Sequence, residues 1–124
     1  MVLDASALLV LINAEPGCDV VAAALPEASI SVINLTEVVT KMIDIGISRR
    51  DAWAEAEDLV PVVVDFGVEL GRRTADLRAS TRSLGLSFGD RACLALADHL
   101  HQPALTADRA WGKLTIGIEI RLIR

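Results

Sequence analysis

The sequence predicts an α/β fold of three layers, α/β/α, with a short central, mainly parallel sheet of four to five strands. Two observations predict this class. Short apolar runs rich in branched side chains alternate along the chain with longer helical segments, and such runs are apolar on both faces, as in parallel strands covered by helices. The 124 residues, of which 52% are hydrophobic, fit one domain over residues 1–124 with a buried core.

Caps and helix breakers divide the chain into its expected elements. Pro16 and Gly17 end the first helix. Asn34 is the expected cap of the third helix, Gly46 ends that helix, and Gly85 ends a long amphipathic helix. The expected strands are residues 1–4, 29–33, 62–66, 103–107 and 118–123. The expected helices are residues 7–14, 18–25, 34–46, 49–59, 68–85, 87–100 and 108–114.

Charge and aromatic content argue against two ways of binding nucleic acid. The formal net charge is −5, which argues against binding through bulk positive charge. Aromatic residues make up 3% of the chain and Tyr is absent, so the stacking platforms of single-strand-binding folds are not expected. A nucleic-acid partner would have to be bound by other means.

The cysteines and the apolar segments indicate a cellular compartment. Cys18 and Cys93 lie far apart and outside any C-x-x-C pattern, so neither a zinc site nor a disulfide framework is indicated and a reducing cytoplasm suits both. The apolar run over residues 7–13 is too short to span a bilayer, and no basic segment of a signal peptide precedes it. We expect a cytoplasmic protein that has no membrane anchor.

Two aspartates lie at the C-terminal ends of predicted strands. Asp4 follows the first apolar run and Asp108 follows the fourth. The carboxyl ends of parallel strands meet at one edge of a sheet, where α/β proteins bind their ligands. Each residue also has an ordinary explanation as an acid that begins a helix and interacts with its dipole. Their positions predict that both point into one crevice.

Two further acids stand three residues after a predicted helix cap. Glu37 follows Asn34 in "NLTE", and Asp90 follows Ser87 in "SFGD". This spacing is that of a capping box, which alone would explain both acids. The helix over residues 49–59 has the same spacing in "SRRD", where no function is predicted. Glu37 begins a helix at the same edge as the two aspartates, whereas the place of Asp90 is less firmly predicted.

A cluster of four carboxylates would require a cation. Each ionised pair about 6 Å apart repels by about 3 kcal/mol at an effective dielectric constant of about 20, as an upper bound. Helix dipoles offset only part of that repulsion. Oxygen ligands without His or Cys favour Mg²⁺ or Mn²⁺ over zinc, and such an ion lets an acidic protein bind a polyanion. The expected chemistry is metal-assisted phosphoryl transfer without a protein nucleophile.

Two hydroxyl side chains are candidate supports for the acids, whereas the histidines are poorly placed for catalysis. Ser6 stands two residues after Asp4 and could orient that carboxylate or a bound water, or could instead cap the first helix. Thr106 is a similar candidate. His99 and His101 lie two residues apart near the end of one helix, so they face different sides and are expected at the surface or at the helix C-terminus.

Four ordered motifs carry a resemblance to a known family. They are "VLDAS", "SVINLTEVV", "LSFGDRACLALA" and "LTADRAW". Together, over essentially the whole chain, they resemble the PIN-domain ribonucleases, specifically the VapC type of toxin from bacterial toxin-antitoxin pairs. The resemblance implies a Mg²⁺- or Mn²⁺-dependent endoribonuclease. It also implies that Ser6 is the small hydroxyl residue beside the first Asp and that the acidic quartet holding the metal is Asp4, Glu37, Asp90 and Asp108.

The resemblance further implies a substrate and partners. Such toxins cleave single-stranded regions of RNA, in tRNA, rRNA or mRNA, and thereby halt translation. They usually form homodimers, and a cognate VapB-like antitoxin inhibits them by laying its tail over the site, often with a basic side chain among the acids. Many relatives have a further acid or Asn about one turn after the last Asp, where this chain has Gly112. The number of metal ions therefore stays open.

Two other functions compete with this interpretation. A receiver domain of a signalling system is also a doubly wound α/β fold, and Asp65 in "VVVDFG" could be its phosphate acceptor. Receivers, however, need two adjacent acids after the first strand and a Lys near the fifth, and only Asp4 and, loosely, Lys113 are available. The second alternative is a PIN-like binding module that has lost its activity. The intact set of four acids argues against it.

Overall fold

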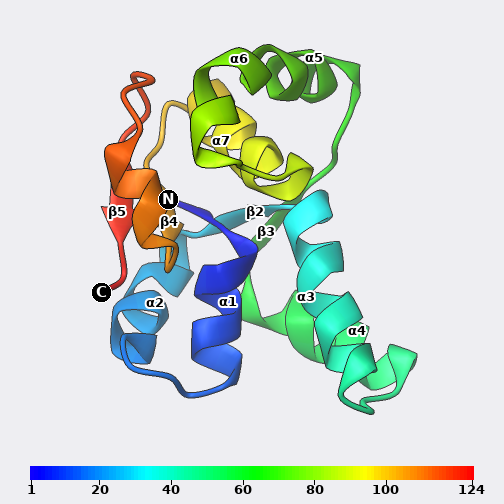
Figure 1. Cartoon of the computed structure of the whole chain (residues 1–124). Coiled ribbons are helices and arrows are strands. Elements are labelled where there is room, and N and C mark those ends of the chain that lie inside the picture. Colours follow the sequence, from blue (N-terminus) through cyan, green and yellow to red (C-terminus); the bar gives the residue numbers. More distant parts are fainter.

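The computed structural model describes residues 1–124 and has the expected α/β/α architecture (Figure 1). A five-stranded sheet lies between two layers of helices, with α5, α6 and α7 on one face and α1 to α4 on the other (Figure 1). The elements are β1 (Val2–Leu3), α1 (Ala5–Ile12), α2 (Cys18–Ala24), the 3-10 helix η1 (Leu25–Glu27), β2 (Ser29–Ser31), α3 (Val32–Asp44), α4 (Arg49–Leu59), β3 (Val62–Val64), α5 (Val68–Asp76), α6 (Arg78–Thr81), the 3-10 helix η2 (Arg82–Leu84), α7 (Phe88–Leu100), β4 (Ala104–Thr106), the 3-10 helix η3 (Arg109–Lys113) and β5 (Ile120–Leu122).

The strands form one fully parallel sheet in the order β3-β2-β1-β4-β5. The short strand β1 is central: Val2 is in register with Ser29 of β2 on one side and with Ala104 of β4 on the other. The chain builds the sheet outward from β1, first through β2 and β3 and later through β4 and β5. Because all five strands run the same way, the segments that follow them leave from one edge of the sheet.

The apolar character of the strands on both faces is explained by two hydrophobic clusters, one on each side of the sheet. Val2 belongs to the cluster that contains Leu94 of α7 and Trp111 of η3. Its neighbour Leu3 belongs to the other cluster, together with Leu8 of α1. All five side chains are fully buried. Successive strand residues point to opposite faces, so a sheet covered by helices on both sides needs apolar residues at every position.

The prediction that Asn34 caps the third helix is wrong. α3 begins at Val32, and Ser31 is its N-cap, with its Oγ accepting a hydrogen bond of 3.2 Å from the backbone N–H of Ile33. Ser and Asn are equally good N-caps, and the chain uses Ser31, which is also the last residue of β2. β2 therefore ends earlier than expected, and Asn34 lies inside the helix with a fully buried side chain.

The single long helix expected over residues 68–85 is divided into α5, α6 and η2. The hydroxyls of Ser80 and Thr81 both donate to the carbonyl of Leu77, at 3.2 and 2.7 Å. Such bonds back to the main chain bend helices, although the regular bond from the N–H of Thr81 to the Leu77 carbonyl is kept at 3.2 Å. Gly85 ends the segment as predicted, in the left-handed region with φ 65°.

The remaining differences are shifts of boundaries. α1 begins at Ala5, two residues earlier than predicted, so Asp4 occupies its N-cap position. The segment after β4 forms the 3-10 helix η3. The longest helices, α3 and α7, have 13 residues each, and none of the helices is both long and apolar enough to cross a membrane.

Candidate active site

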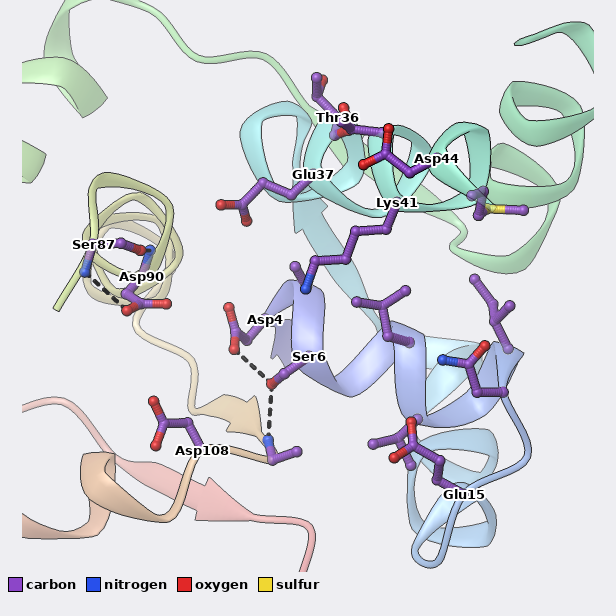
Figure 2. A pocket seen from close by; sticks show the side chains of 18 of the residues that line it. Asp4, Ser6, Glu15, Thr36, Glu37, Lys41, Asp44, Ser87, Asp90 and Asp108 are labelled. Atoms are coloured by element: carbon purple, nitrogen blue, oxygen red, sulfur yellow. Dashed lines mark hydrogen bonds between the residues drawn. The ribbon is translucent and has the colours of Figure 1, made fainter. Parts of the chain in front are cut away.

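A pocket of about 970 Å³ opens at the carboxyl edge of the sheet, between α1, α3, the start of α7 and the segment after β4 (Figure 2). All four acids named from the sequence line it: Asp4, Glu37, Asp90 and Asp108. Figure 2 shows their side chains around one space, each from a different segment. Residues far apart in the chain thus meet because parallel strands end at the same edge.

Asp4 is held at the bottom of this pocket by two hydroxyl groups. Ser6 Oγ donates a hydrogen bond of 2.7 Å to Asp4 Oδ2, and Thr106 Oγ1 donates one of 3.0 Å to the same oxygen. Asp4 is only 4% exposed. Although it occupies the N-cap position of α1, its side chain makes no capping hydrogen bond. Its carboxylate belongs to the pocket rather than to the helix.

The same two hydroxyls connect the end of β1 to the segment that carries Asp108. Ser6 Oγ accepts a bond of 3.0 Å from the backbone N–H of Ala107, and Thr106 Oγ1 accepts one of 3.0 Å from the N–H of Asp108. Asp108 also caps η3, since its Oδ1 accepts from the N–H of Ala110 at 3.0 Å. The exposed carboxylate of Asp108 is therefore fixed relative to the buried one of Asp4.

Glu37 is held by residues of α3 and α7. Asn34 Nδ2 donates to Glu37 Oε2 at 3.1 Å and to the carbonyl oxygen of Gly89 at 2.9 Å. The carboxylate of Glu37 lies against Gly89: a Cβ at that position would lie 2.6 Å from the Glu37 carboxyl carbon. The capping-box explanation of Glu37 therefore does not apply, because Asn34 is no cap and contacts the carboxylate itself.

Asp90 forms the capping box that the sequence indicates, and it also lines the pocket. Its Oδ2 accepts from the backbone N–H of Ser87 at 2.9 Å, and Ser87 Oγ accepts from the N–H of Asp90 at 3.2 Å. In α4, Ser48 Oγ accepts from the N–H of Asp51, but Asp51 does not line the pocket. Equal spacing thus gives similar helix starts, and the sheet topology decides which acid reaches the pocket.

The acids influence one another electrostatically. Burial raises the pKa of Asp4 from 3.8 to about 6; the hydrogen bond from Ser6 opposes this and the charge of Asp90 adds to it. Burial, and then the charges of Asp4, Asp90 and Glu37, raise the pKa of the fully buried Cys93 thiol. Charges from three segments therefore act on one region of the interior.

The donor chemistry of the pocket fits a hard divalent cation. Neither His nor Cys lines the pocket, whereas carboxylates and hydroxyls do, and such oxygen donors suit Mg²⁺ and Mn²⁺. The carboxylates surround the space without forming a closed ligand shell, since no group of three or more acidic, His or Cys side chains is set closely enough to hold an ion.

A family model describes the same region. The model of the PIN domain matches residues 1–116. The chain belongs to the PIN domain family. Membership of the PIN domain family excludes the receiver-domain alternative. Asp65, the phosphate acceptor that a receiver domain would use, does not line the pocket. The resemblance of the four sequence motifs is thereby confirmed for the PIN domain.

Solved structures share this PIN fold. The chain matches a toxin-antitoxin complex from Klebsiella pneumoniae at 18% identity and a TM-score of 0.77, covering 99% of this chain and 97% of that one. DNA-bound VapBC from Salmonella typhimurium matches at 18% identity and a TM-score of 0.74, with coverage of 99% and 97%. VapBC-1 from nontypeable Haemophilus influenzae matches at 14% identity and a TM-score of 0.72, with coverage of 98% and 96%. A comparison with curated protein sequences finds no match.

Several residues at the PIN pocket were not predicted from the sequence, among them Glu15 and Asp44, which also line it. Asn34 and Gly89, which hold Glu37, were assigned to a cap or left without a role. Lys41 also lines the pocket, and its side chain extends toward Asp4 and Ser6 (Figure 2). Lys41 follows Glu37 by four residues, the spacing that places two side chains on one helix face, so this position was recognisable. The contact of Asn34 with Gly89, 55 residues away, has no local signal.

Proposed function

We propose that this protein is a metal-dependent endoribonuclease of the VapC type, the toxin of a toxin-antitoxin pair. The proposal rests on one observation: four of the six acids that line one pocket at the carboxyl edge of the sheet come from separate segments and are those named from the sequence. Membership of the PIN domain family supports a nuclease. The similar solved structures, which include toxin-antitoxin complexes, support the toxin class.

The residues have distinct roles in the proposed reaction. Asp4, Glu37, Asp90 and Asp108 would hold Mg²⁺ or Mn²⁺, and Ser6 and Thr106 would orient Asp4. A bound ion of this kind lowers the pKa of a coordinated water and stabilises charge on a phosphoryl group. Ser6 Oγ donates its hydrogen to Asp4 and accepts one from the backbone N–H of Ala107, so we assign it to orienting Asp4 rather than to nucleophilic attack. We therefore propose that water attacks the phosphorus of an RNA phosphodiester, that a P–O bond to ribose breaks, and that the ribose oxygen leaves as a hydroxyl with a proton from that water.

Exposed apolar side chains beside the pocket support one of the proposed partners. Ile43 and Ile45 of the α3 end are 37% and 73% exposed, and Ile45 lines the pocket. Large apolar side chains at this exposure favour a protein partner, which we propose to be a VapB-like antitoxin that covers the acids. We further propose a homodimer of single-domain chains, spanning residues 1–124, that acts in the cytoplasm.

Removal of the metal ion tests this function directly. The purified protein, separated from any antitoxin, is expected to cleave single-stranded RNA when Mg²⁺ or Mn²⁺ is added and to stop when a chelator is added. The measurement is gel analysis of a labelled RNA, with calorimetric titration of Mn²⁺ in parallel. Cleavage that continues in the chelator would exclude the metal-dependent mechanism. RNA binding without cleavage would favour the inactive PIN-like module.

A further inference from the structure

We propose that Asn34 is a positioning residue, which fixes the Glu37 carboxylate against α7 and thereby sets its place relative to Asp90. This inference rests on the proposed function, since it concerns the same acids. Asn34 is fully buried and uses both hydrogens of its amide, one on Glu37 Oε2 and one on the carbonyl of Gly89. Because Gly89 immediately precedes Asp90, one side chain links the segments that carry two of the acids.

The orientation of the Asn34 amide is fixed by its neighbours. A flipped amide would point Oδ1 at a carboxylate oxygen and a carbonyl oxygen, which are both acceptors. In the observed orientation Oδ1 is buried and has no hydrogen-bond partner. An unpaired buried polar atom destabilises the folded state. An apolar side chain would avoid this destabilisation, so the amide is explained better by its contact with Glu37 than by packing.

Gly89 leaves room for the Glu37 carboxylate at the same contact. It is the second residue of α7, and its backbone is not in a conformation that requires glycine, unlike Gly85 with φ 65°. A Cβ at this position would lie 2.6 Å from the carboxyl carbon of Glu37 and 2.7 Å from its Oε2, so any larger residue would displace the carboxylate. A buried amide with an unpaired atom and a glycine therefore meet at one carboxylate. The unpaired buried atom breaks a local rule, and such violations are expected to concentrate at functional sites.

A packing role and a positioning role for Asn34 predict opposite results for Asn34→Leu. Leu has a similar size and removes both hydrogen bonds together with the unpaired oxygen. If Asn34 only joins α3 to α7, the variant should lose thermal stability and keep its activity. If Asn34 positions Glu37, the variant should fold normally, bind Mn²⁺ about tenfold or more weakly, as replacement of a residue behind a metal ligand does, and lose kcat with little change in KM.

Three further variants complete the experiment. Asn34→Ala repeats the test in case the Leu side chain does not fit between α3 and α7. Thr81→Ala is the matched control, because Thr81 is fully buried, donates one side-chain hydrogen bond to the carbonyl of Leu77 and is remote from the pocket; it should bind Mn²⁺ like wild type. In a Glu37→Gln background, adding Asn34→Leu should change neither Mn²⁺ binding nor kcat further, since residues that act through one another are not additive.

The outcomes separate this inference from the function on which it rests. Wild-type values of Mn²⁺ binding and kcat in folded Asn34→Leu or Asn34→Ala, with Asp90→Asn inactive, would overturn the positioning role and leave the nuclease intact. A full additional loss in the Glu37→Gln background would also overturn it, because Asn34 would then act elsewhere. A wild-type protein that neither binds Mn²⁺ nor cleaves RNA would overturn both proposals.

Discussion

Asp90→Asn is expected to reduce RNA cleavage by about a hundredfold or more, because replacement of residues that only support metal ligands already reduces activity 10–100-fold. The change removes one negative charge and little else. Asn Oδ1 can still accept from the N–H of Ser87, and Ser87 Oγ can still accept from the N–H of residue 90, the two bonds of the observed capping box. The measurement is the rate of cleavage of a labelled RNA at saturating Mn²⁺.

Asp51→Asn is the matched control for this prediction. Asp51 stands three residues after the cap Ser48, as Asp90 does after Ser87, and its N–H also donates to the cap hydroxyl. It is exposed and does not line the pocket. We expect its cleavage rate to stay within about twofold of wild type, since surface changes away from a site have small effects. Equal rates for Asp90→Asn and wild type would remove Asp90 from the proposed site.

Asp4→Asn is expected to stabilise the metal-free protein and to abolish the proposed RNA cleavage. Burial raises the pKa of Asp4 from 3.8 to about 6, so between these values the folded state holds a proton that the unfolded state releases. The ionised carboxylate therefore destabilises the fold: the effect is absent below pH 3.8, grows as the pH rises and is complete above pH 6. At about 1.4 kcal/mol for each pKa unit, it amounts to about 3 kcal/mol.

Urea unfolding in the presence of chelator measures this effect. The free energy of unfolding of Asp4→Asn should exceed that of wild type by about 3 kcal/mol at neutral pH, and the difference should shrink towards zero near pH 4. Asp108→Asn provides the comparison within the same pocket, because Asp108 is exposed and its capping bond to Ala110 can be kept by the amide oxygen. A difference for Asp4→Asn that does not depend on pH would contradict the burial argument.

The parts of the fold that follow from local patterns were predictable. Apolar strand segments gave the parallel sheet, and acids placed directly after strands or in a cap spacing gave Asp4, Asp108 and Asp90. Glu37 was expected at this edge because it begins the helix after the second strand, whereas Asn34, expected to cap that helix, is buried beside it. The spacing of a capping box does not show whether the acid bonds to the start of its own helix or points into a pocket. The direction of its side chain depends on the neighbouring helices and strands that pack against it.

Features that depend on contacts between distant segments were not predictable. The break after α5 involves hydroxyls at Ser80 and Thr81 that bond to Leu77, in a sequence whose amphipathic pattern continues through the bend. The need for Gly89 arises only when α3 approaches α7. Neither residue of such a contact shows in the sequence that the other lies beside it. The contacts that hold Glu37 could therefore be identified only from the structure.

The fully buried thiol of Cys93 beneath the acids gives the pocket a chemical reporter. Alkylating reagents attack the thiolate, and burial together with the nearby negative charges suppresses both its formation and its accessibility. Labelling of Cys93 therefore requires the protein to open locally or to unfold. The labelling rate of Cys93, measured separately from that of the more exposed Cys18, therefore reports opening of the interior next to the acids, and the measurement needs no substrate.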